Sequence, residues 1–163
     1  MYKTILIATD YSLESLNILK KVLKEKEYHN DGTKYTILFV SGYDMGDSIR
    51  DLLFTTKTNI LNKIRSQEFV DACSIINNKY PNIIDKISYD AFTGSMQRAF
   101  NNYVESQKIE EAYFSTSVKY KSVNRKFSLV PYIKKSKTLK IQDIQLEVYE
   151  SIPEKGRLAE VFI

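Results

Sequence analysis

The run from position 3 to position 10, KTILIATD, constrains the fold of this chain more than any other segment. Its apolar residues alternate between the two faces of a strand, so both faces must be covered, which is typical of the interior of a parallel sheet. Ligands of such sheets bind beyond the carboxyl ends of the strands, which is where Asp10 stands. The same pattern also fits Asp10 or Ser12 as the cap of a following helix. Both interpretations stay open.

Helical and strand-like patterns alternate along the rest of the chain. Apolar residues recur every three or four positions after Asp10 and return further on as short runs rich in β-branched and aromatic residues. The strands are expected at 3–10, 35–40, 87–91 (an edge strand), 112–116 and 138–142, and the helices at 13–26, 48–80 with a break near Ser66, 96–104 and 129–135. This order predicts an α/β fold built from right-handed βαβ units.

The alternation of apolar residues changes phase near the C-terminus. Leu139 and Ile141 are odd-numbered, whereas Ile144, Leu146 and Val148 are even-numbered. Such a change indicates a bulge or turn at Gln142–Asp143. Residues 143–163 are then expected to form a C-terminal β-hairpin that extends the α/β domain of residues 1–142.

Composition bounds the class of protein. A chain of 163 residues is the size of one domain, and its 43% hydrophobic and 27% charged residues are ordinary for a globular protein. The single cysteine, Cys73, lies among apolar residues at helical spacing and is expected to be a buried packing residue. No apolar run approaches the ~18 residues of a membrane span, so we expect a cytoplasmic protein without a membrane partner.

Three segments of the sequence resemble the universal stress protein family. Residues 2–12, with Leu16 following, are similar to that family's first strand, its aspartate and its first helix. Residues 92–96 are similar to the loop into its third helix, and residues 127–133 to the start of its last helix. The resemblance covers residues 1–142. It implies an adenine nucleotide alpha hydrolase-like fold with a five-stranded parallel sheet in the order 3-2-1-4-5, flanked by helices, in a protein that is commonly a homodimer.

The glycine motif with which this family binds ATP is missing. That motif, G-x-x-G, nine residues, then G followed by Ser or Thr, lets backbone amides approach the phosphates without a Cβ in the way. This chain has no glycine between Gly94 and Gly156. One alignment places Phe114, Ser117 and Phe127–Ser128 on the motif, and an alignment shifted by one places Ser115, Val118 and Ser128 there. The resemblance therefore implies a degenerate member, for which we expect no ATP cofactor.

A nucleotide site built by other means is the alternative. Hydroxyl groups after the fourth strand, together with nearby lysines, could hold a phosphate, and Asp10 and the backbone of Val40 match positions that touch nucleotide in the family. The candidate ATP-binding residues are Asp10, Val40, Ser115, Ser117 and Ser128. If Tyr120 or Phe127 fills the space beside these residues, the pocket is closed and nucleotide binding is disfavoured; if the space is open, nucleotide binding is favoured.

A basic segment is the second functional signal. Between residues 112 and 142 there are eight cations and, after position 112, no acid until Asp143. The cations are Lys119, Lys121, Arg125, Lys126, Lys134, Lys135, Lys137 and Lys140. The segment from Lys119 to Lys140 could meet an acidic protein partner, while the lack of a nucleic-acid motif makes nucleic acid an unexpected ligand.

Catalytic and metal-binding patterns are weak. His29 is the only histidine and lies in a polar turn, far from any serine or cysteine motif. No cluster with metal-ligand spacing is present in the sequence. We therefore expect a non-catalytic protein, with no metal site, that acts in the stress response through partner binding or through a homodimer made by its C-terminal strands.

Overall fold

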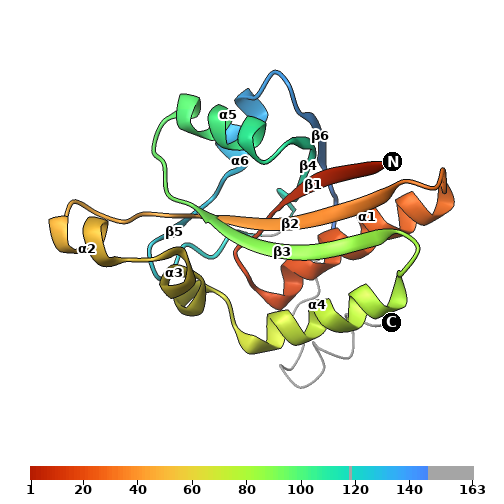
Figure 1. Cartoon of the computed structure of the whole chain (residues 1–163), viewed down its shortest axis with the longest axis horizontal. Helices are drawn as coiled ribbons and strands as arrows, with labels where there is room; N and C mark the ends of the chain where they lie inside the picture. Colours follow the sequence, from red (N-terminus) through yellow and green to blue (C-terminus); the bar gives the residue numbers. More distant parts are fainter. Residues whose placement is uncertain (118, 147–163) are drawn as a thin grey trace.

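The computed structural model describes residues 1–117 and 119–146 of the chain (Figure 1). The strands are β1 (Tyr2–Ala8), β2 (Lys34–Tyr43), β3 (Ile84–Phe92), β4 (Ile109–Phe114), β5 (Lys126–Phe127) and β6 (Lys140–Asp143). The helices are the 3-10 helix η1 (Leu13–Ser15), then α1 (Leu16–Tyr28), α2 (Ile49–Phe54), α3 (Lys57–Ile64), α4 (Gln67–Lys79), α5 (Gln97–Ser106) and α6 (Val130–Lys135). Among the described residues, no helix is both long enough and apolar enough to cross a membrane.

Five strands form a parallel sheet in the order β3-β2-β1-β4-β6. Since β6 is the fifth strand expected from the sequence, the predicted order 3-2-1-4-5 is confirmed, with β3 at an edge. The two-residue strand β5 was not predicted. It pairs antiparallel with the end of β2, where Phe127 lies opposite Gly42.

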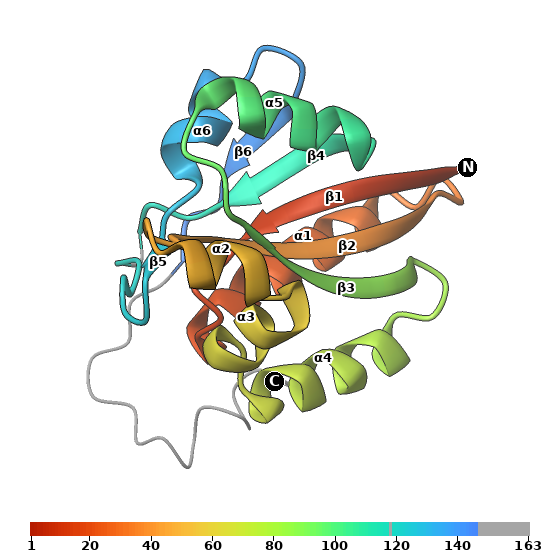
Figure 2. The same cartoon turned by 60° about the vertical axis from the view of Figure 1, so that its left-hand side comes forward.

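The apolar run of β1 is buried on both faces, as predicted. Ile5 and Ile7 pack into one core with α1, α3 and α4, while Leu6 and Ala8 pack into a second core with α5 and α6. Figure 2 shows these two helical layers on opposite sides of the sheet. The carboxyl ends of the parallel strands therefore share one edge, where loops from both layers meet.

The segment expected as one broken helix, 48–80, forms three helices. Each begins at a hydroxyl residue whose side chain accepts a hydrogen bond from a backbone N–H three positions ahead, at Ser48 (3.4 Å), Thr56 (3.2 Å) and Ser66 (3.2 Å). The break at Ser66 was predicted, and the break at Thr55–Thr56 was not. The first of the three helices, α2, projects away from the sheet (Figure 1).

The turn or bulge predicted at Gln142–Asp143 is wrong. The pairing of β6 with β4 runs without a register shift to Asp143, and the N–H of Ile144 still donates to Phe114 (2.7 Å). The apolar positions change phase because burial switches from one face of the sheet to the other. Leu139 packs into the α5–α6 core, whereas Ile144 and Leu146 pack into the α1–α4 core. The hairpin expected over 143–163 lies outside the described residues apart from its first four positions.

An ion pair joins α1 to β4 beside the larger core, with Glu111 buried and Lys26 partly buried. Lys26 Nζ lies 2.9 Å from Glu111 Oε1, which also accepts a hydrogen bond from the Tyr113 hydroxyl (2.9 Å), and the ammonium lies over the rings of Tyr35 and Tyr113. Burial acts to raise the pKa of Glu111, but the hydrogen bonds from Lys26 and Tyr113 outweigh it and lower that pKa. The pair fixes the position of α1 on the sheet.

Candidate functional site

The predicted site lies at the carboxyl ends of β1 and β4, around Asp10. This carboxylate is 6% exposed, and both of its oxygens accept hydrogen bonds from the chain itself. Oδ1 accepts from the backbone N–H of Ser12 (2.9 Å) and from its hydroxyl (2.5 Å), while Oδ2 accepts from the backbone N–H of Lys121 (3.1 Å). Asp10 thus joins the start of η1 to the loop that follows β4.

The hydrogen bonds of Asp10 resemble those of a helix cap, since its carboxylate binds the backbone N–H of Ser12 at the start of η1. Ser12 occupies the N-cap position of η1, but its side chain makes no capping hydrogen bond; its hydroxyl donates to Asp10 instead. The turn is completed by the Thr9 hydroxyl, which accepts from the N–H of Tyr11 (2.8 Å) and shares a hydrogen bond with the Ser15 hydroxyl (2.7 Å). The polar groups at this strand end are therefore largely occupied by local contacts.

Residues of β5 and of the loop before it, 115–117 and 119–125, occupy the space beside Asp10. The Tyr120 hydroxyl hydrogen-bonds the Ser41 hydroxyl at the end of β2, and the Lys126 ammonium donates to the Asp10 carbonyl (2.6 Å). Phe127 lies directly against Gly42. The cavity that remains between Asp10 and Tyr120 has a volume of about 50 Å³. We refer to residues 115–117 and 119–125, together with β5, as the β4–β5 segment.

Burial alters the acid–base properties of this segment. It raises the pKa of Tyr120 to about 12, partly opposed by the hydrogen bond with Ser41 and reinforced by the negative charge of Asp10. Burial also lowers the pKa of Lys126, as does the neighbouring Lys121, while Asp10 opposes both effects. The Tyr120 hydroxyl is therefore neutral throughout the physiological range.

The five candidate ATP-binding residues do not converge on one cavity. Asp10, Ser115 and Ser128 line the small cavity. The carbonyl of Val40, by contrast, accepts the N–H of Thr9 (3.0 Å), and Val40 itself is fully buried. Ser117 lies outside the cavity lining, where its hydroxyl bonds that of Ser115 (2.6 Å) and accepts the N–H of Leu146 (2.8 Å). The Ser128 hydroxyl accepts the N–H of Val130 (3.2 Å) at the start of α6.

The turn into β5 uses left-handed backbone without glycine. Asn124 and Arg125 have φ angles of 55° and 63°. Asparagine tolerates this region better than most residues, whereas arginine is uncommon there. The turn directs Arg125 toward α2, where its side chain pairs with Asp51.

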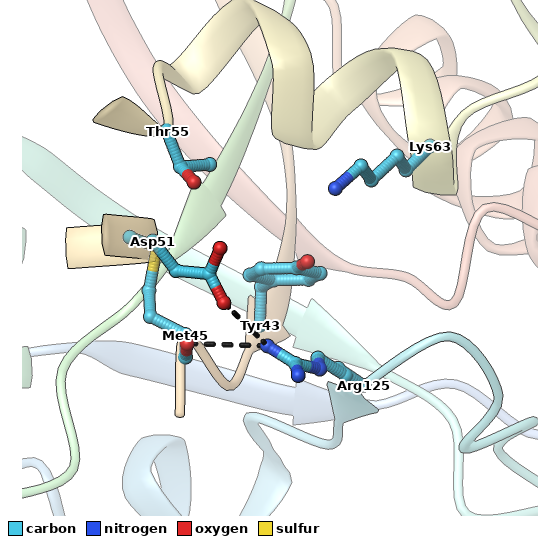
Figure 3. A pocket seen from close by; sticks show the side chains of 6 residues that line it. All are labelled: Tyr43, Met45, Asp51, Thr55, Lys63 and Arg125. Carbon is cyan, nitrogen blue, oxygen red and sulfur yellow. Dashed lines mark hydrogen bonds and ion pairs between the residues drawn. The ribbon is translucent and has the colours of Figure 1, made fainter. Parts of the chain in front are cut away.

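Arg125 borders a second pocket, of about 260 Å³, beyond the end of β2 (Figure 3). Its Nη1 donates to the Met45 carbonyl (3.1 Å) and lies 3.8 Å from Asp51 Oδ2, and its own carbonyl accepts the N–H of Asp44 (2.9 Å). Figure 3 shows the guanidinium beside the Tyr43 ring, with Asp51 reaching down from α2. The β4–β5 segment is thereby tied both to Asp10 and to α2.

Sequence reasoning missed a polar junction at the end of β3. Asp90 accepts hydrogen bonds from Lys57 of α3 (3.0 Å) and from the Tyr103 hydroxyl of α5 (2.6 Å). The buried Tyr11 hydroxyl lies within hydrogen-bonding distance of the carbonyls of Phe39 (3.0 Å) and Asp90 (2.8 Å), and it accepts the N–H of Asp90 (3.1 Å). Tyr11 holds a φ of 60°, and burial strongly raises its pKa. No spacing in the sequence indicates this junction, because its members come from five segments that lie far apart in the sequence.

The cations of the predicted basic segment have several kinds of neighbour. Lys121 pairs with Glu14 (3.5 Å), and the ammonium of Lys134 lies over the ring of Phe114. Lys135 and Lys137 border an open groove of about 800 Å³ between α5 and the start of β6, together with Glu105 and Glu110. Several of the cations are therefore balanced by acids or used in packing, as in an ordinary solvated face.

Within residues 1–117 and 119–146 there is no group of three or more histidine, cysteine, aspartate or glutamate side chains arranged to hold a metal ion. The thiol of Cys73 is buried, as predicted, and burial raises its pKa to about 12.

Comparison with proteins of known structure identifies the fold. No protein-family model matches the sequence, and no curated protein is significantly similar to it. A protein from the universal stress protein family of Burkholderia pseudomallei is similar in structure, with 13% sequence identity, a TM-score of 0.54, and coverage of 88% of this chain and 96% of that chain. A universal stress protein from Lactobacillus plantarum has 15% identity and a TM-score of 0.50, over 88% of this chain and 98% of its own. The chain therefore has the universal stress protein fold, as its sequence indicated.

Proposed function

We propose that this chain is a non-catalytic protein with the universal stress protein fold, which acts by self-association or by binding a protein partner. The observation that carries the proposal is the β4–β5 segment, the part of the chain where that family has its glycine motif. Here Tyr120 and Phe127 contact the end of β2, and Lys126 binds the Asp10 carbonyl. About 50 Å³ remains beside Asp10, against roughly 300–1,000 Å³ for pockets that hold drug-sized ligands. A nucleotide could enter only if this segment moved.

The environment of Asp10 supports a structural role over a catalytic one. Its two carboxylate oxygens already accept three hydrogen bonds, two of them from backbone N–H groups, so a ligand at Asp10 would have to displace these partly buried contacts. The fold by itself does not determine activity. A role in the stress response rests on analogy of fold, and the reduced, buried thiol of Cys73 is compatible with a cytoplasmic location.

Thermal melting with Mg-ATP tests the absence of a nucleotide site. A site saturated at about 100 times its Kd would add about 2.7 kcal/mol of stability, or roughly 5–11 °C for a chain of this size. We expect no shift at millimolar Mg-ATP and no release of phosphate. A shift of several degrees would contradict the proposal and would favour the alternative, an ATP-binding protein that uses Asp10, Ser115 and Ser128 with Lys119 beside them.

The self-association part of the proposal is tested separately by sedimentation. The C-terminal strands are the homodimer surface that we propose from the sequence. Because Ile144 and Leu146 are buried in the core, the chain is shortened after Leu146. We expect this shortened chain to associate more weakly than the full chain. An unchanged balance between monomer and dimer would contradict a C-terminal interface.

A further inference from the structure

The pocket of about 260 Å³ beyond the end of β2 has no part in the proposed function (Figure 3). The residues that line it are Tyr43 at the end of β2, Met45 in the loop that follows, Asp51 on α2, Thr55 at the end of α2, Lys63 on α3, and Arg125 just before β5. Its volume corresponds to roughly nine water-sized groups at ~30 Å³ each, and it lies below the range of about 300–1,000 Å³ for drug-sized ligands. The pocket therefore suits a small molecule.

The Tyr43 hydroxyl is a polar group that lacks a partner on a buried residue. Tyr43 is 5% exposed, yet no residue in the described part of the chain hydrogen-bonds its hydroxyl. Figure 3 shows this hydroxyl and the Lys63 ammonium directed into the pocket. Because polar groups of buried side chains are nearly always hydrogen-bonded, the partner of this hydroxyl has to come from within the pocket.

The two cations of the pocket also have donors to offer. Among residues 1–117 and 119–146, Lys63 has neither an acidic partner nor a hydrogen bond. Arg125 uses Nη1 for the Met45 carbonyl (3.1 Å), and a guanidinium has more N–H donors than this contact needs. The 3.8 Å between Nη1 and Asp51 Oδ2 is too long for a hydrogen bond, so the ion pair leaves the guanidinium able to bind a ligand.

We propose that this pocket binds a small phosphate monoester, with the phosphate between Lys63, Arg125 and the Tyr43 hydroxyl. These three donors come from three separate parts of the fold. Donors that approach from different sides match the three terminal oxygens of a tetrahedral phosphate better than the two coplanar oxygens of a carboxylate.

The remaining lining residues define the organic part of the ligand. Asp51 is an acceptor and suits a hydroxyl group, while Met45 offers an apolar surface. With two cations and one acid the lining has a net charge of +1, which disfavours a triphosphate or a nucleic acid. A phosphorylated polyol of about ten heavy atoms, such as glycerol 3-phosphate, has the matching size and groups. The pocket shares no lining residue with the cavity beside Asp10, so this inference is independent of the proposed function.

Thermal melting of the full chain in phosphate-free buffer tests the proposal. The melting temperature should rise with the concentration of glycerol 3-phosphate, and the dependence gives a Kd. Lys63→Gln should raise this Kd roughly 10- to 100-fold, because a hydrogen bond to a charged group is lost. Lys24→Gln is the matched control, since it removes the same charge from an exposed position of α1 outside the pocket, and should bind as the parent chain does.

Tyr43→Phe separates ligand binding from a structural role. This variant keeps the buried ring and removes only the hydroxyl. We expect it to melt as the parent chain does without ligand, and to bind glycerol 3-phosphate roughly 3- to 10-fold more weakly. A lower melting temperature without ligand, together with unchanged binding, would mean that the hydroxyl serves the fold and would overturn the inference.

Two further compounds test the class of ligand. Inorganic phosphate should also raise the melting temperature, with a weaker Kd, and glycerate, which carries a carboxylate in place of the phosphate, should bind at least roughly 10-fold more weakly than glycerol 3-phosphate. Equal affinity for glycerate would contradict a phosphate site. The absence of any shift with either phosphate compound at about 10 mM would contradict a site altogether.

Amide hydrogen exchange locates the ligand independently. Glycerol 3-phosphate should slow exchange in residues 43–64 of the parent chain, and this protection should be lost in Lys63→Gln. Protection confined to residues 8–15 would place the ligand beside Asp10 and would overturn the inference.

Discussion

Replacing Gly42 by alanine should detach β5 from β2. A Cβ at position 42 would lie closer than 3.0 Å to two ring carbons of Phe127 and 2.6 Å from its carbonyl oxygen. Gly42 is not one of the residues with positive φ, so its own backbone accommodates alanine without strain. The effect of the substitution therefore comes from the contact with β5 alone.

The magnitude follows from the kind of atom that the Cβ would meet. A clash with a ring could be relieved by rotating the side chain, but a clash with a backbone oxygen requires the strand to move. Overpacking of this kind costs about 1–3 kcal/mol, which corresponds to roughly 2–12 °C in melting temperature for a chain of 163 residues. Adding Phe127→Ala should recover only part of this loss, since the carbonyl stays.

Thermal melting and limited trypsin digestion together test this reasoning. In Gly42→Ala, the free energy of unfolding should fall and cleavage after Lys119, Lys121 and Lys126 should become faster. Gly32→Ala is the control for destabilisation elsewhere in the chain. Nothing lies within 4 Å of its Cβ, so its unfavourable φ of 82° should lower the melting temperature without speeding cleavage in the β4–β5 segment. If Gly42→Ala melted like the parent chain and kept the same cleavage rate, β5 would not hold the segment closed.

Two further predictions concern buried and exposed charges. Lys26→Met leaves Glu111 buried without its cation and should lower the free energy of unfolding by about 3–5 kcal/mol in urea titrations, whereas Lys24→Met at an exposed position should change it by less than about 0.5 kcal/mol. Because folding lowers the pKa of Glu111, the ion pair stabilises the protein above the unfolded pKa of ~4.3, and this stabilisation is lost as the pH falls through the folded pKa. The difference in free energy of unfolding between the parent chain and Lys26→Met should therefore narrow below about pH 4. A difference that is independent of pH would contradict the role given to Glu111. Arg125→Ala should change the melting temperature little, because the ion pair of Arg125 with Asp51 is exposed, but it should speed amide hydrogen exchange in residues 44–56. Unchanged exchange would show that Arg125 does not hold α2.

The sheet could be predicted from the sequence because its strands carry strong local patterns. The run before Asp10 is apolar on both faces, and only an interior parallel strand satisfies that pattern. The Ser66 break was visible because a hydroxyl cap interrupts the apolar stripe there. The phase change after Ile141 was seen but misinterpreted, because a switch of burial from one face to the other produces the same pattern as a bulge.

What the sequence did not reveal depends on contacts between distant segments. A strand of two residues has no periodicity, and β5 exists because Gly42 leaves room for Phe127. The exposure of α2 was not predicted, since periodicity shows that a helix has an apolar side but not what that side contacts. The full occupation of Asp10 likewise needs the N–H of Lys121, more than a hundred positions away.

The β4–β5 segment connects the closed site around Asp10 to helix α2. Lys126 and the N–H of Lys121 bind Asp10, while Arg125, between them in sequence, binds Met45 and pairs with Asp51. Any event that withdraws the segment from Asp10 must therefore strain the contacts that position α2. Coupling between two sites is reciprocal, so loosening the contact with α2 should also favour the opening of the segment. Trypsin cleavage after Lys121 should therefore be faster in Asp51→Asn, which removes the charge that pairs with Arg125. An unchanged cleavage rate in Asp51→Asn would mean that α2 and Asp10 act separately.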